Sequence, residues 1–451
     1  MSSCTQLDFP LDILAQQSRI NTIYTQLVFF FVANTSDSDS LTQIISSLDA
    51  ALSTLYQSFP WTSGNVIEEN NRFVIRVSER KPRLIVNDLR TSTSFPDWNA
   101  LAAAQFPFRW LDENIIAARK TLADATELKT GLPVFLVKVN ITQGGLLVSF
   151  DSQHGSMDMT GQAELIRLFA KACRHEPYTP SELAIANKDR TNVVPLLNHL
   201  DIETELTERS DSGSSHVSPA PARESTLTWA YFIFSARSLS DLKSLAMQNV
   251  EKGGFVSTDD SLSAFIWMSL CRARACRFGH EAPYLSTLSR NVDVRRVFSQ
   301  PSSYTGLLVT STIHTKSLDE LERSSLGSVA LQLRAALAPE KLKRQLQVQA
   351  SLMSRGAGDR YRSVITSDPR LDVRVSSWAK ETCCILDFGS PLQHPDAVRT
   401  PRFAEGAREG LVYLLPRTKT GEIVVGICLR EDDMETLIHD ELWSSRSSYI
   451  G

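Results

Sequence analysis

A histidine and an aspartate stand four residues apart where an apolar segment gives way to a helical pattern. Residues 146–150 (LLVSF) are apolar enough for a half-buried strand, and apolar residues recur at helical spacing over 159–173. His154 and Asp158 fall in the turn between the two. An imidazole with an ordinary pKa of about 6.5 can accept a proton near neutral pH, so this turn is a candidate site for general base catalysis.

Two other interpretations of this pair stay open. A histidine beside a carboxylate can ligate a metal, but two ligands without a third nearby make a poor metal site. A packed structural histidine is the other alternative, because an isolated H-x-x-x-D arises easily by chance. The position favours catalysis, since a side chain between a strand end and a helix start can project into a cleft with its tautomer fixed by neighbours.

Length and charge limit the classes of protein to consider. A chain of 451 residues exceeds what one hydrophobic core usually serves, which predicts two domains. The formal net charge of -4 gives no electrostatic reason to expect nucleic acid or an anionic membrane as a partner. A local basic pocket for a phosphorylated ligand is still compatible with this balance.

The cysteines and the first residues of the chain indicate the cellular compartment of the protein. The seven cysteines are scattered and odd in number, which indicates reduced packing thiols, and none has the spacing of a zinc site. The first residues, MSSCTQLDFPLD, lack a basic segment followed by an apolar one, and the longest apolar run, 27–32, is too short to cross a bilayer. We therefore predict a cytoplasmic protein with no bound metal and no membrane segment.

Helical and strand patterns alternate along the first half of the chain without a repeat. We predict one helix and three strands before the turn, at 42–56, 73–77, 83–89 and 134–142. Ser, Pro, Glu and Asp replace the apolar periodicity at 201–225, which predicts an exposed crossover linker. The expected domains are therefore 1–200 and 226–451.

The second half also mixes both types of element. Two pairs of residues have the spacing of a capping box: Ser238 with Asp241, and Ser257 with Asp260. Each pair therefore predicts the start of a helix. We predict further strands at 229–234, 373–379, 410–416 and 421–430, and helices at 318–353 and 431–443. The fold class is therefore α/β, with two mixed domains.

Five motifs in a fixed order resemble a known family. The BAHD-type CoA-dependent acyltransferases have motifs similar to five segments of this chain: QHGSMD (153–158), FVSTDDSLSAFIW (255–267), NVDVR (291–295), SSWAK (376–380) and DFG (387–389). Further strings resemble the fungal trichothecene 3-O-acetyltransferases in particular: IYTQL, LDENIIAARKTL, QHGSMDMTGQ and the closing YIG. The resemblance covers essentially the whole chain.

The resemblance implies an architecture. It implies two similar chloramphenicol-acetyltransferase-like domains, each a mixed β-sheet flanked by helices, with an active-site channel between them. CoA would enter this channel from one side and the alcohol from the other. A segment around 355–400 is expected to pack with the N-terminal domain. Each active site would be complete within one chain, which implies a monomer.

The resemblance also implies roles for the first motif. His154 becomes the general base that takes the proton of the acceptor hydroxyl and returns it to the sulfur of CoA, without an acyl-enzyme. A carboxylate can orient a catalytic histidine, so Asp158 could form a dyad with His154. The family pattern instead implies that Asp158 is structural and pairs with Arg295.

Other motifs are expected to serve the oxyanion and CoA. By resemblance, the Ser376 hydroxyl and the Trp378 indole N–H would donate to the tetrahedral oxyanion, although Trp378 could also be a core aromatic. The expected CoA contacts are Lys252, Ser257, Thr258 and Ser377, the first of them to a phosphate. Ser257 can equally act only as a helix cap.

Two segments depart from the family pattern. Asp387 and Gly389 begin a DFG motif that is usually a structural element, but Ser390 and Pro391 follow where an apolar residue and a second glycine are expected. Because proline fixes its φ angle and lacks an amide donor, this loop is expected to differ near the CoA side. Residues 309–310 are Val-Thr where the trichothecene enzymes tend to carry Gln-Asn, which could mean a different acceptor.

The resemblance favours an O-acetyltransferase that moves an acetyl group from acetyl-CoA to a hydroxyl of a fungal secondary metabolite. A trichothecene 3-hydroxyl is the leading acceptor, and another terpenoid or polyketide alcohol is the alternative. Acetyl-CoA would be a co-substrate, with no permanently bound cofactor. A nonribosomal condensation domain usually doubles the histidine, where Gln153 stands here, and no G-x-S-x-G elbow of an α/β-hydrolase is present. A degenerate CoA-binding protein without activity is the alternative of another class.

Overall fold

The computed structural model describes residues 7–77, 81–198, 226–248, 250, 254–278, 284–356, 368 and 370–451. The chain forms two compact units, which we call unit 1 and unit 2. Unit 1 comprises Met1–Val193, Phe298–Leu308 and Glu381–Gly406, and unit 2 comprises Val194–Val297, Val309–Lys380 and Ala407–Gly451. The linker predicted at 201–225 lies outside the described residues.

The two units do not follow the predicted order of 1–200 and then 226–451, because Phe298–Leu308 and Glu381–Gly406 belong to unit 1. The second of these segments supplies strand β13 (Ala397–Arg399), which pairs antiparallel with β2 (Tyr24–Val32). The second segment overlaps the one around 355–400 that the family resemblance implies packs with the N-terminal domain, whereas nothing in the sequence indicated the transfer of Phe298–Leu308.

A five-stranded sheet forms the centre of unit 1, in the order β13-β2-β8-β7-β5. Its other strands are β8 (Gly145–Gln153), β7 (Phe135–Thr142) and β5 (Ile85–Asp88). Strand β8 lies between β2 and β7, antiparallel to both, and each of its nine residues is buried. The strand that leads to His154 is therefore held by pairing and packing on all sides.

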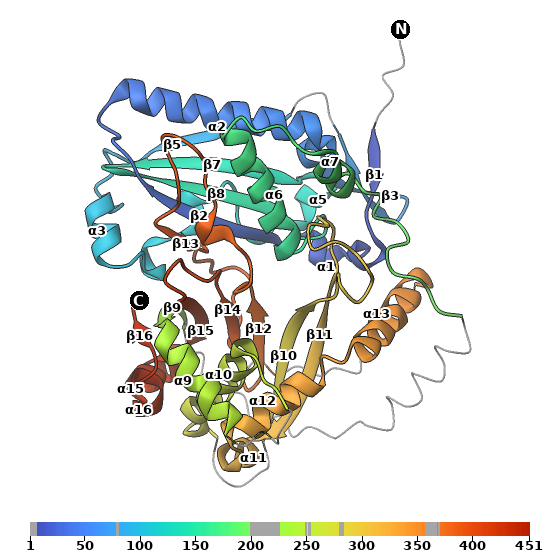
Figure 1. Ribbon diagram of the computed structural model, residues 1–451, viewed down its shortest axis with the longest axis vertical. Coiled ribbons are helices and arrows are strands. Elements are labelled where there is room, and N and C mark those ends of the chain that lie inside the picture. Colours follow the sequence, from blue (N-terminus) through green and yellow to red (C-terminus); the bar gives the residue numbers. More distant parts are fainter. Residues whose placement is uncertain are drawn as a thin grey trace. The chain divides into compact units, whose positions relative to one another are not determined.

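Aromatic side chains fill the face of this sheet that α6 (Met159–Cys173) covers. The ring of Phe150 in β8 lies 5.3 Å from that of Phe169 in α6. Phe388, from the DFG motif, packs against Phe29 and Phe31 of β2 at 5.6 and 5.2 Å. Helix α2 (Ser38–Ser58) runs beside α6, as Figure 1 shows.

Polar side chains on the opposite face of the sheet hold the chain near 115–119. Because side chains alternate along a strand, Asp151 points away from the face of Phe150. The Asp151 carboxylate accepts from the Ala118 amide at 3.0 Å. The Lys138 ammonium of β7 donates to the Ile115 carbonyl at 2.6 Å. Buried polar groups thus fix a loop on the sheet through its backbone.

Unit 1 also has a second sheet and several short helices. The sheet has the order β1-β4-β3-β6, with β1 (Asp8–Pro10), β4 (Arg72–Arg76), β3 (Asn65–Glu69) and β6 (Leu132–Pro133). The α-helices are α1 (Ser18–Asn21), α3 (Trp98–Ala103), α4 (Glu113–Ile116), α5 (Ala125–Thr130) and α7 (Pro180–Ala186). The 3-10 helices are η1 (Ile13–Ala15), η2 (Pro60–Ser63), η3 (Phe108–Trp110) and η4 (Cys383–Ile385).

Unit 2 is built on a seven-stranded sheet in the order β11-β10-β12-β14-β15-β9-β16. The strands are β9 (Leu227–Phe234), β10 (Leu285–Asp293), β11 (Val309–Ser317), β12 (Val373–Ser377), β14 (Leu411–Leu414), β15 (Ile423–Arg430) and β16 (Ser448–Tyr449). The pairs of β12 with β10 and with β14 are parallel, and the other pairs are antiparallel. Each unit therefore carries a mixed fold, as predicted.

The helices of unit 2 are α9 (Ala236–Met247), α10 (Thr258–Ala275), α11 (Leu318–Arg323), α12 (Leu326–Ala335), α13 (Pro339–Ser354), α15 (Glu431–His439) and α16 (Glu441–Ser444). Helix α10 packs between α9 and α12, as Figure 1 shows. Its Trp267 is fully buried and donates to the Ser286 hydroxyl at 2.9 Å. The helix is buried on most sides, and its buried residues include polar ones such as Ser261, Ser263 and Ser269.

Three predictions about helices were wrong. The predicted helix 318–353 is three helices, because Ser325 caps α12 and Pro339 begins α13, where a proline is compatible with the first turn only. The final predicted helix is two, since the Asp440 carboxylate caps α16. Helix α9 begins earlier than predicted, with Ser235 as its cap in place of Ser238.

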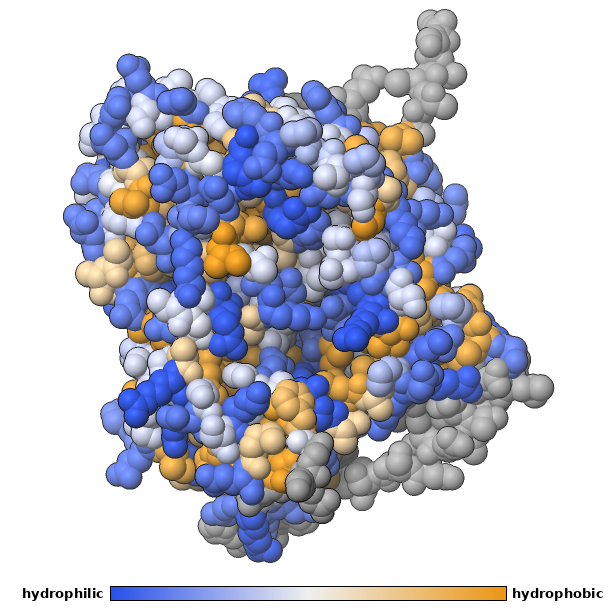
Figure 2. Space-filling model, in the orientation of Figure 1, coloured by the Kyte–Doolittle hydropathy of each residue, from blue (hydrophilic) through white to orange (hydrophobic). Residues whose placement is uncertain are grey.

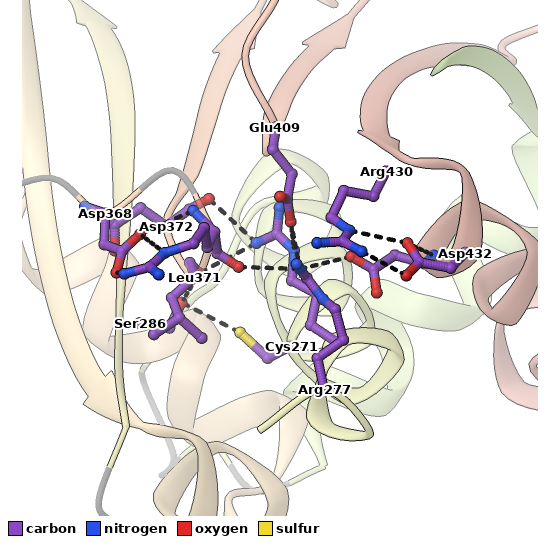
Figure 3. A network of polar contacts seen from close by, with 12 residues as sticks. Cys271, Arg277, Ser286, Asp368, Leu371, Asp372, Glu409, Arg430 and Asp432 are labelled. Carbon is purple, nitrogen blue, oxygen red and sulfur yellow. Dashed lines mark hydrogen bonds and ion pairs between the residues drawn. The ribbon is translucent and has the colours of Figure 1, made fainter. Parts of the chain in front are cut away.

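A network of polar contacts, drawn in Figure 3, joins α10 and the following Arg277 to strand β10, to Glu409 and to α15. The Arg274 side chain is fully buried, and its Nε lies 3.0 Å from Glu409. Arg277 pairs with Glu409 and with Asp433 of α15. The Arg274 guanidinium also donates to the Leu371 carbonyl at 3.1 Å. Removing one member of such a buried network would leave a charge without compensation.

On the face that Figure 2 shows, the surface consists mainly of hydrophilic residues, with hydrophobic residues scattered among them. Among the described residues, the most exposed large hydrophobic side chains are Leu442 and Val32, at 61% and 60%. Within the described part of the chain, every helix is too short or too polar to cross a bilayer.

Candidate active site

The turn that carries His154 connects β8 directly to α6. The strand ends at Gln153 and the helix begins at Met159, which confirms the strand, turn and helix predicted around this histidine. Asp158 is the N-cap of α6, because its carboxylate accepts from the Gly161 amide at 2.9 Å. A well-paired strand and a capped helix therefore fix both ends of the turn.

His154 is half-buried, and two hydrogen bonds orient it. Its amide donates to the Ile23 carbonyl at 2.8 Å, and its Nδ1 lies 3.2 Å from the Met157 carbonyl oxygen. A carbonyl only accepts, so Nδ1 carries the proton and Nε2 has a free lone pair in the neutral ring. Among the described residues no hydrogen bond to Nε2 is found.

Burial lowers the pKa of His154 below its ordinary value. The Met157 carbonyl and the charge of Asp158 act in the opposite direction and are weaker. The imidazole is therefore neutral at pH 7, which is the form that a general base requires.

Asp158 is buried and bonded to two backbone amides. Besides Gly161, its carboxylate accepts from the Leu308 amide at 2.8 Å, which brings Phe298–Leu308 to the start of α6. Gly161 permits this approach, since a Cβ there would lie 2.3 Å from the Thr305 carbonyl oxygen. These contacts give Asp158 a role in positioning the chain.

Arg295 lies in unit 2, where it is buried and its Nη1 pairs with Asp293 at 3.0 Å. Asp293 also pairs with Lys380 at 2.9 Å, which joins the NVDVR and SSWAK motifs. The pairing of Arg295 with Asp158 concerns residues of different units and stays a prediction.

In unit 2 the two predicted oxyanion donors are bonded to each other. The Trp378 indole N–H donates to the Ser376 hydroxyl oxygen at 3.0 Å. The Trp378 ring, only 5% exposed, stacks on Tyr413 at 4.9 Å, and Tyr413 stacks on Trp229 at 5.8 Å. Trp378 is thus a packed aromatic whose N–H is occupied, while the Ser376 proton is directed elsewhere. No pattern in the sequence indicates this bond.

Three of the four predicted CoA contacts lie near the start of α10. The capping box is confirmed, since the Ser257 hydroxyl donates to Asp260 at 2.7 Å and accepts from the Asp260 amide at 3.1 Å. Thr258 is the first residue of the helix and is half-buried. The Ser377 hydroxyl donates to Asp259. Lys252 lies outside the described residues.

Sequence reasoning missed the arginines that neutralise the two aspartates of this helix start. Arg290 lies 3.2 Å from Asp259 and 2.8 Å from Asp260, and Arg334 also pairs with Asp260. Both arginines come from distant segments, β10 and α12, so no local motif marks them. The helix start therefore carries balanced charges.

The DFG motif belongs to unit 1 and makes structural contacts. The Asp387 carboxylate accepts from the Gly389 amide at 2.8 Å, and the Asp387 carbonyl accepts from Arg174. Gly389 has a φ of 74°, a left-handed conformation that favours glycine. The Ser390–Pro391 bond that follows is cis.

The described residues hold no group of three or more His, Cys, Asp or Glu side chains that could bind a metal. The chemistry that these residues can supply is proton transfer and hydrogen bonding. His154 offers a base, and Ser376 offers an O–H donor.

Comparison with known proteins identifies the family. Residues 23–173 match the family described as the trichothecene 3-O-acetyltransferase-like N-terminal domain. The trichothecene 3-O-acetyltransferase TRI101 of Fusarium sporotrichioides is 39% identical over 463 residues, which cover 100% of this chain and 99% of that protein. The O-acetyltransferase dmxR13 of Cryptosporiopsis sp. is 40% identical over 461 residues, with 99% and 98% covered.

Solved structures agree with this similarity. The crystal structure of TRI101 from F. sporotrichioides, complexed with coenzyme A and T-2, matches with a TM-score of 0.86 and 37% identity, covering 99% of this chain and 100% of that one. Vinorine synthase, at 14% identity and a TM-score of 0.67, shares the fold. By its similarity over the full length, the chain belongs to the trichothecene 3-O-acetyltransferase-like family of BAHD-type acyltransferases.

Proposed function

We propose that this protein moves an acetyl group from acetyl-CoA to a hydroxyl of a small hydrophobic secondary metabolite, with a trichothecene 3-hydroxyl as the leading acceptor. The observation that carries the proposal is the His154 turn, where Nδ1 faces the Met157 carbonyl and Nε2 keeps its lone pair. The names of the relatives, which are O-acetyltransferases, support the same reaction.

In the proposed reaction His154 transfers one proton twice. Its Nε2 takes the proton of the acceptor hydroxyl while the oxygen attacks the thioester carbonyl carbon, forming a tetrahedral intermediate. The C–S bond then breaks, and the imidazolium returns the proton to the thiolate of CoA. An aliphatic hydroxyl is too weak an acid to ionise freely near neutral pH, so the base is required for attack.

Ser376 is the proposed donor to the oxyanion of the intermediate. The Trp378 N–H occupies a lone pair of the Ser376 oxygen, which supports a hydroxyl whose own proton is available to a negative charge. Trp378 then acts on the oxyanion through Ser376 instead of donating to it. Removing an oxyanion donor typically lowers kcat by about 100-fold to 1,000-fold.

The CoA contacts belong to the same proposal. The candidate residues for binding coenzyme A remain Lys252, Ser257, Thr258 and Ser377. The Ser257 and Ser377 hydroxyls donate to Asp260 and Asp259. The binding roles of Ser257 and Ser377 would therefore use backbone amides or a rearranged hydroxyl. The Thr258 hydroxyl makes no hydrogen bond with the described residues.

A second acceptor class is supported by two observations. A relative named for trichothecene acetylation and one named only as an O-acetyltransferase are equally similar to this chain, at 39% and 40% identity. Thr310, at the Gln-Asn position of the trichothecene group, is only 5% exposed and accepts from the Gln345 amide at 3.2 Å. Another terpenoid or polyketide alcohol is the acceptor if this segment sets specificity.

A cytoplasmic monomer completes the proposal. Six described cysteines are free thiols, and five of them are buried, as is usual in a reducing compartment. The assembly state is measured by light scattering on the purified protein, where a dimer would contradict the monomer.

The proposal is tested by incubating the purified protein with acetyl-CoA and a panel of alcohols. The panel contains deoxynivalenol, its 3-O-acetyl derivative as the matched control, and unrelated fungal terpenoid and polyketide alcohols. Products are identified by mass spectrometry. An acetylated product from deoxynivalenol alone supports the leading acceptor, and a product from another alcohol keeps the reaction and changes the substrate. CoA binding without any product contradicts the proposed activity on this panel.

A further inference from the structure

Two buried amide side chains close the turn that carries His154, and the proposed reaction assigns no role to either. Asn21 and Gln153 are both 0% exposed. Asn21 ends helix α1, and Gln153 ends strand β8 directly before His154. Burying an amide oxygen or nitrogen without a hydrogen bond is costly, so the partners of each amide define what it holds.

Gln153 bonds along the turn and across to Asn21. Its side-chain oxygen accepts from the Ser156 amide at 2.7 Å, and its backbone carbonyl accepts from the Ser156 hydroxyl at 2.6 Å. Its Nε2 donates to both the carbonyl and the side-chain oxygen of Asn21, at 2.9 Å each. One side chain therefore spans the turn from its first residue to its fourth.

Asn21 anchors Gln153 to the preceding segment. Its Nδ2 donates to the Ala15 carbonyl at 2.6 Å and to the Gln17 carbonyl at 3.0 Å. Carbonyls only accept, so the nitrogen of Asn21 must face them and its oxygen must face Gln153. The orientations of both amides are thus fixed by their partners.

Gly155 shows how closely Asn21 approaches the turn. A Cβ at position 155 would lie 2.0 Å from the side-chain oxygen of Asn21 and 3.2 Å from Nε2 of Gln153. The glycine next to His154 is therefore required by this amide pair. The contact leaves the turn little freedom to change its shape.

We infer that Asn21 and Gln153 are positioning residues for acetyl transfer, an inference that rests on the proposed function. They fix the shape of the turn, which holds the Met157 carbonyl where it accepts the Nδ1 proton of His154. The ring then presents Nε2 unprotonated to the acceptor hydroxyl. Loss of the amide pair frees the turn, so the ring loses its single orientation and its single tautomer.

The test compares Gln153→Met with Gln162→Met as its matched control. Gln162 is also 0% exposed, and its Nε2 also donates to two backbone carbonyls, those of Thr25 and Phe150 at 3.1 and 3.0 Å. Its side chain does not bond to the turn. Both variants therefore lose a buried amide, but only one loses the support of His154.

A second pair of variants keeps the test decisive if Gln153→Met does not fold. Asn21→Leu removes the acceptor for Gln153, whereas Asn21→Asp keeps an oxygen there and, when protonated, a donor toward the Ala15 carbonyl. We expect kcat to fall at least about tenfold in Gln153→Met and Asn21→Leu, with KM for acetyl-CoA within about threefold of wild type. Asn21→Asp should recover most of kcat.

A chemical readout separates this inference from the proposed function. Diethyl pyrocarbonate modifies unprotonated histidine, and mass spectrometry of the His154 peptide gives the pH midpoint of its reaction without any acceptor. Because burial and the Met157 contact together set the pKa of His154, freeing the turn should move the midpoint in Gln153→Met but not in Gln162→Met. This comparison decides the inference even if wild type acetylates no alcohol, a result that would contradict only the proposed function.

Two results would overturn the inference. One is a kcat loss in Gln153→Met no larger than in Gln162→Met. The other is a larger kcat loss with an unchanged midpoint, because a general loss of structure would then explain it.

Discussion

The imidazole Nδ1 of His154 lies 3.2 Å from the carbonyl oxygen of Met157, three residues further along the same turn. This contact assigns the proton of the neutral ring to Nδ1 and leaves Nε2 as the basic atom. Because no side-chain carboxylate makes this bond, the orientation of the base depends on backbone geometry.

The first prediction concerns the pH dependence of catalysis. Burial lowers the pKa of His154, so the neutral base persists to a lower pH than an exposed histidine would allow. The acid limb of kcat/KM should therefore have its midpoint below the ordinary value of 6.5, and activity should fall as pH drops through it. Steady-state rates measured between pH 5 and 9, at intervals of about half a pH unit, test this prediction. A midpoint above 6.5 would contradict the assignment.

The second prediction separates Ser376 from Trp378. Ser376→Ala should lower kcat by about 100-fold, because the donor to the oxyanion is lost. Trp378→Phe should cost less, since the ring that stacks on Tyr413 is retained and only the bond to Ser376 disappears. The order of the two kcat values, measured with saturating acetyl-CoA, is the test. Equal losses in both variants would instead favour Trp378 as a direct donor.

The third prediction concerns the close contact between α6 and the segment 298–308. Gly161→Ala places a Cβ 2.3 Å from the Thr305 carbonyl oxygen, so the segment must move. We expect the free energy of unfolding to fall by about 1–3 kcal/mol. At a helical position with open space around it, the same substitution would raise the free energy of unfolding, because alanine forms helices better than glycine by roughly 1 kcal/mol. Urea denaturation of both proteins decides between the two.

The fourth prediction concerns Asp151, three residues before His154 in β8. Burial raises its pKa from 3.8 to about 7, so the folded state holds the proton more tightly than the unfolded state. Its contribution to stability is complete below pH 3.8 and is lost as pH rises through about 7. Asp151→Asn keeps an acceptor for the Ala118 amide but cannot ionise.

The stability of Asp151→Asn relative to wild type should therefore increase between pH 4 and 8, by at most about 4 kcal/mol. Denaturation at several pH values within this range measures the difference. A difference that stays constant with pH would show that Asp151 is already ionised in the folded protein.

Local patterns predicted much of the fold, and the reasons for the failures are physical. The predicted helix 42–56 is α2 (Ser38–Ser58), and the predicted strand 134–142 is β7 (Phe135–Thr142). The long helix predicted over 318–353 was wrong, because apolar periodicity continues through the breaks at Ser325 and Pro339. The family resemblance indicated that a segment around 355–400 packs with the N-terminal domain, whereas the transfer of Phe298–Leu308 into unit 1 left no local signal.

In the candidate site, too, local patterns predicted the elements but not the contacts between distant residues. The position of His154 between strand and helix followed from the sequence, as did the capping box at Ser257. The bond between Trp378 and Ser376 depends on rotamers that no pattern encodes. The amide pair of Asn21 and Gln153 joins residues 132 apart in the chain, which only the folded sheet brings together.

The central claim is that His154 is the general base of acetyl transfer. The most direct test measures CoA release by wild type and by His154→Ala with the best acceptor found, together with the CoA dissociation constant of each. We predict that kcat falls by about 100-fold or more in the variant while CoA binding stays unchanged, because only proton transfer is lost. A variant that retains turnover within a few-fold of wild type would contradict the account.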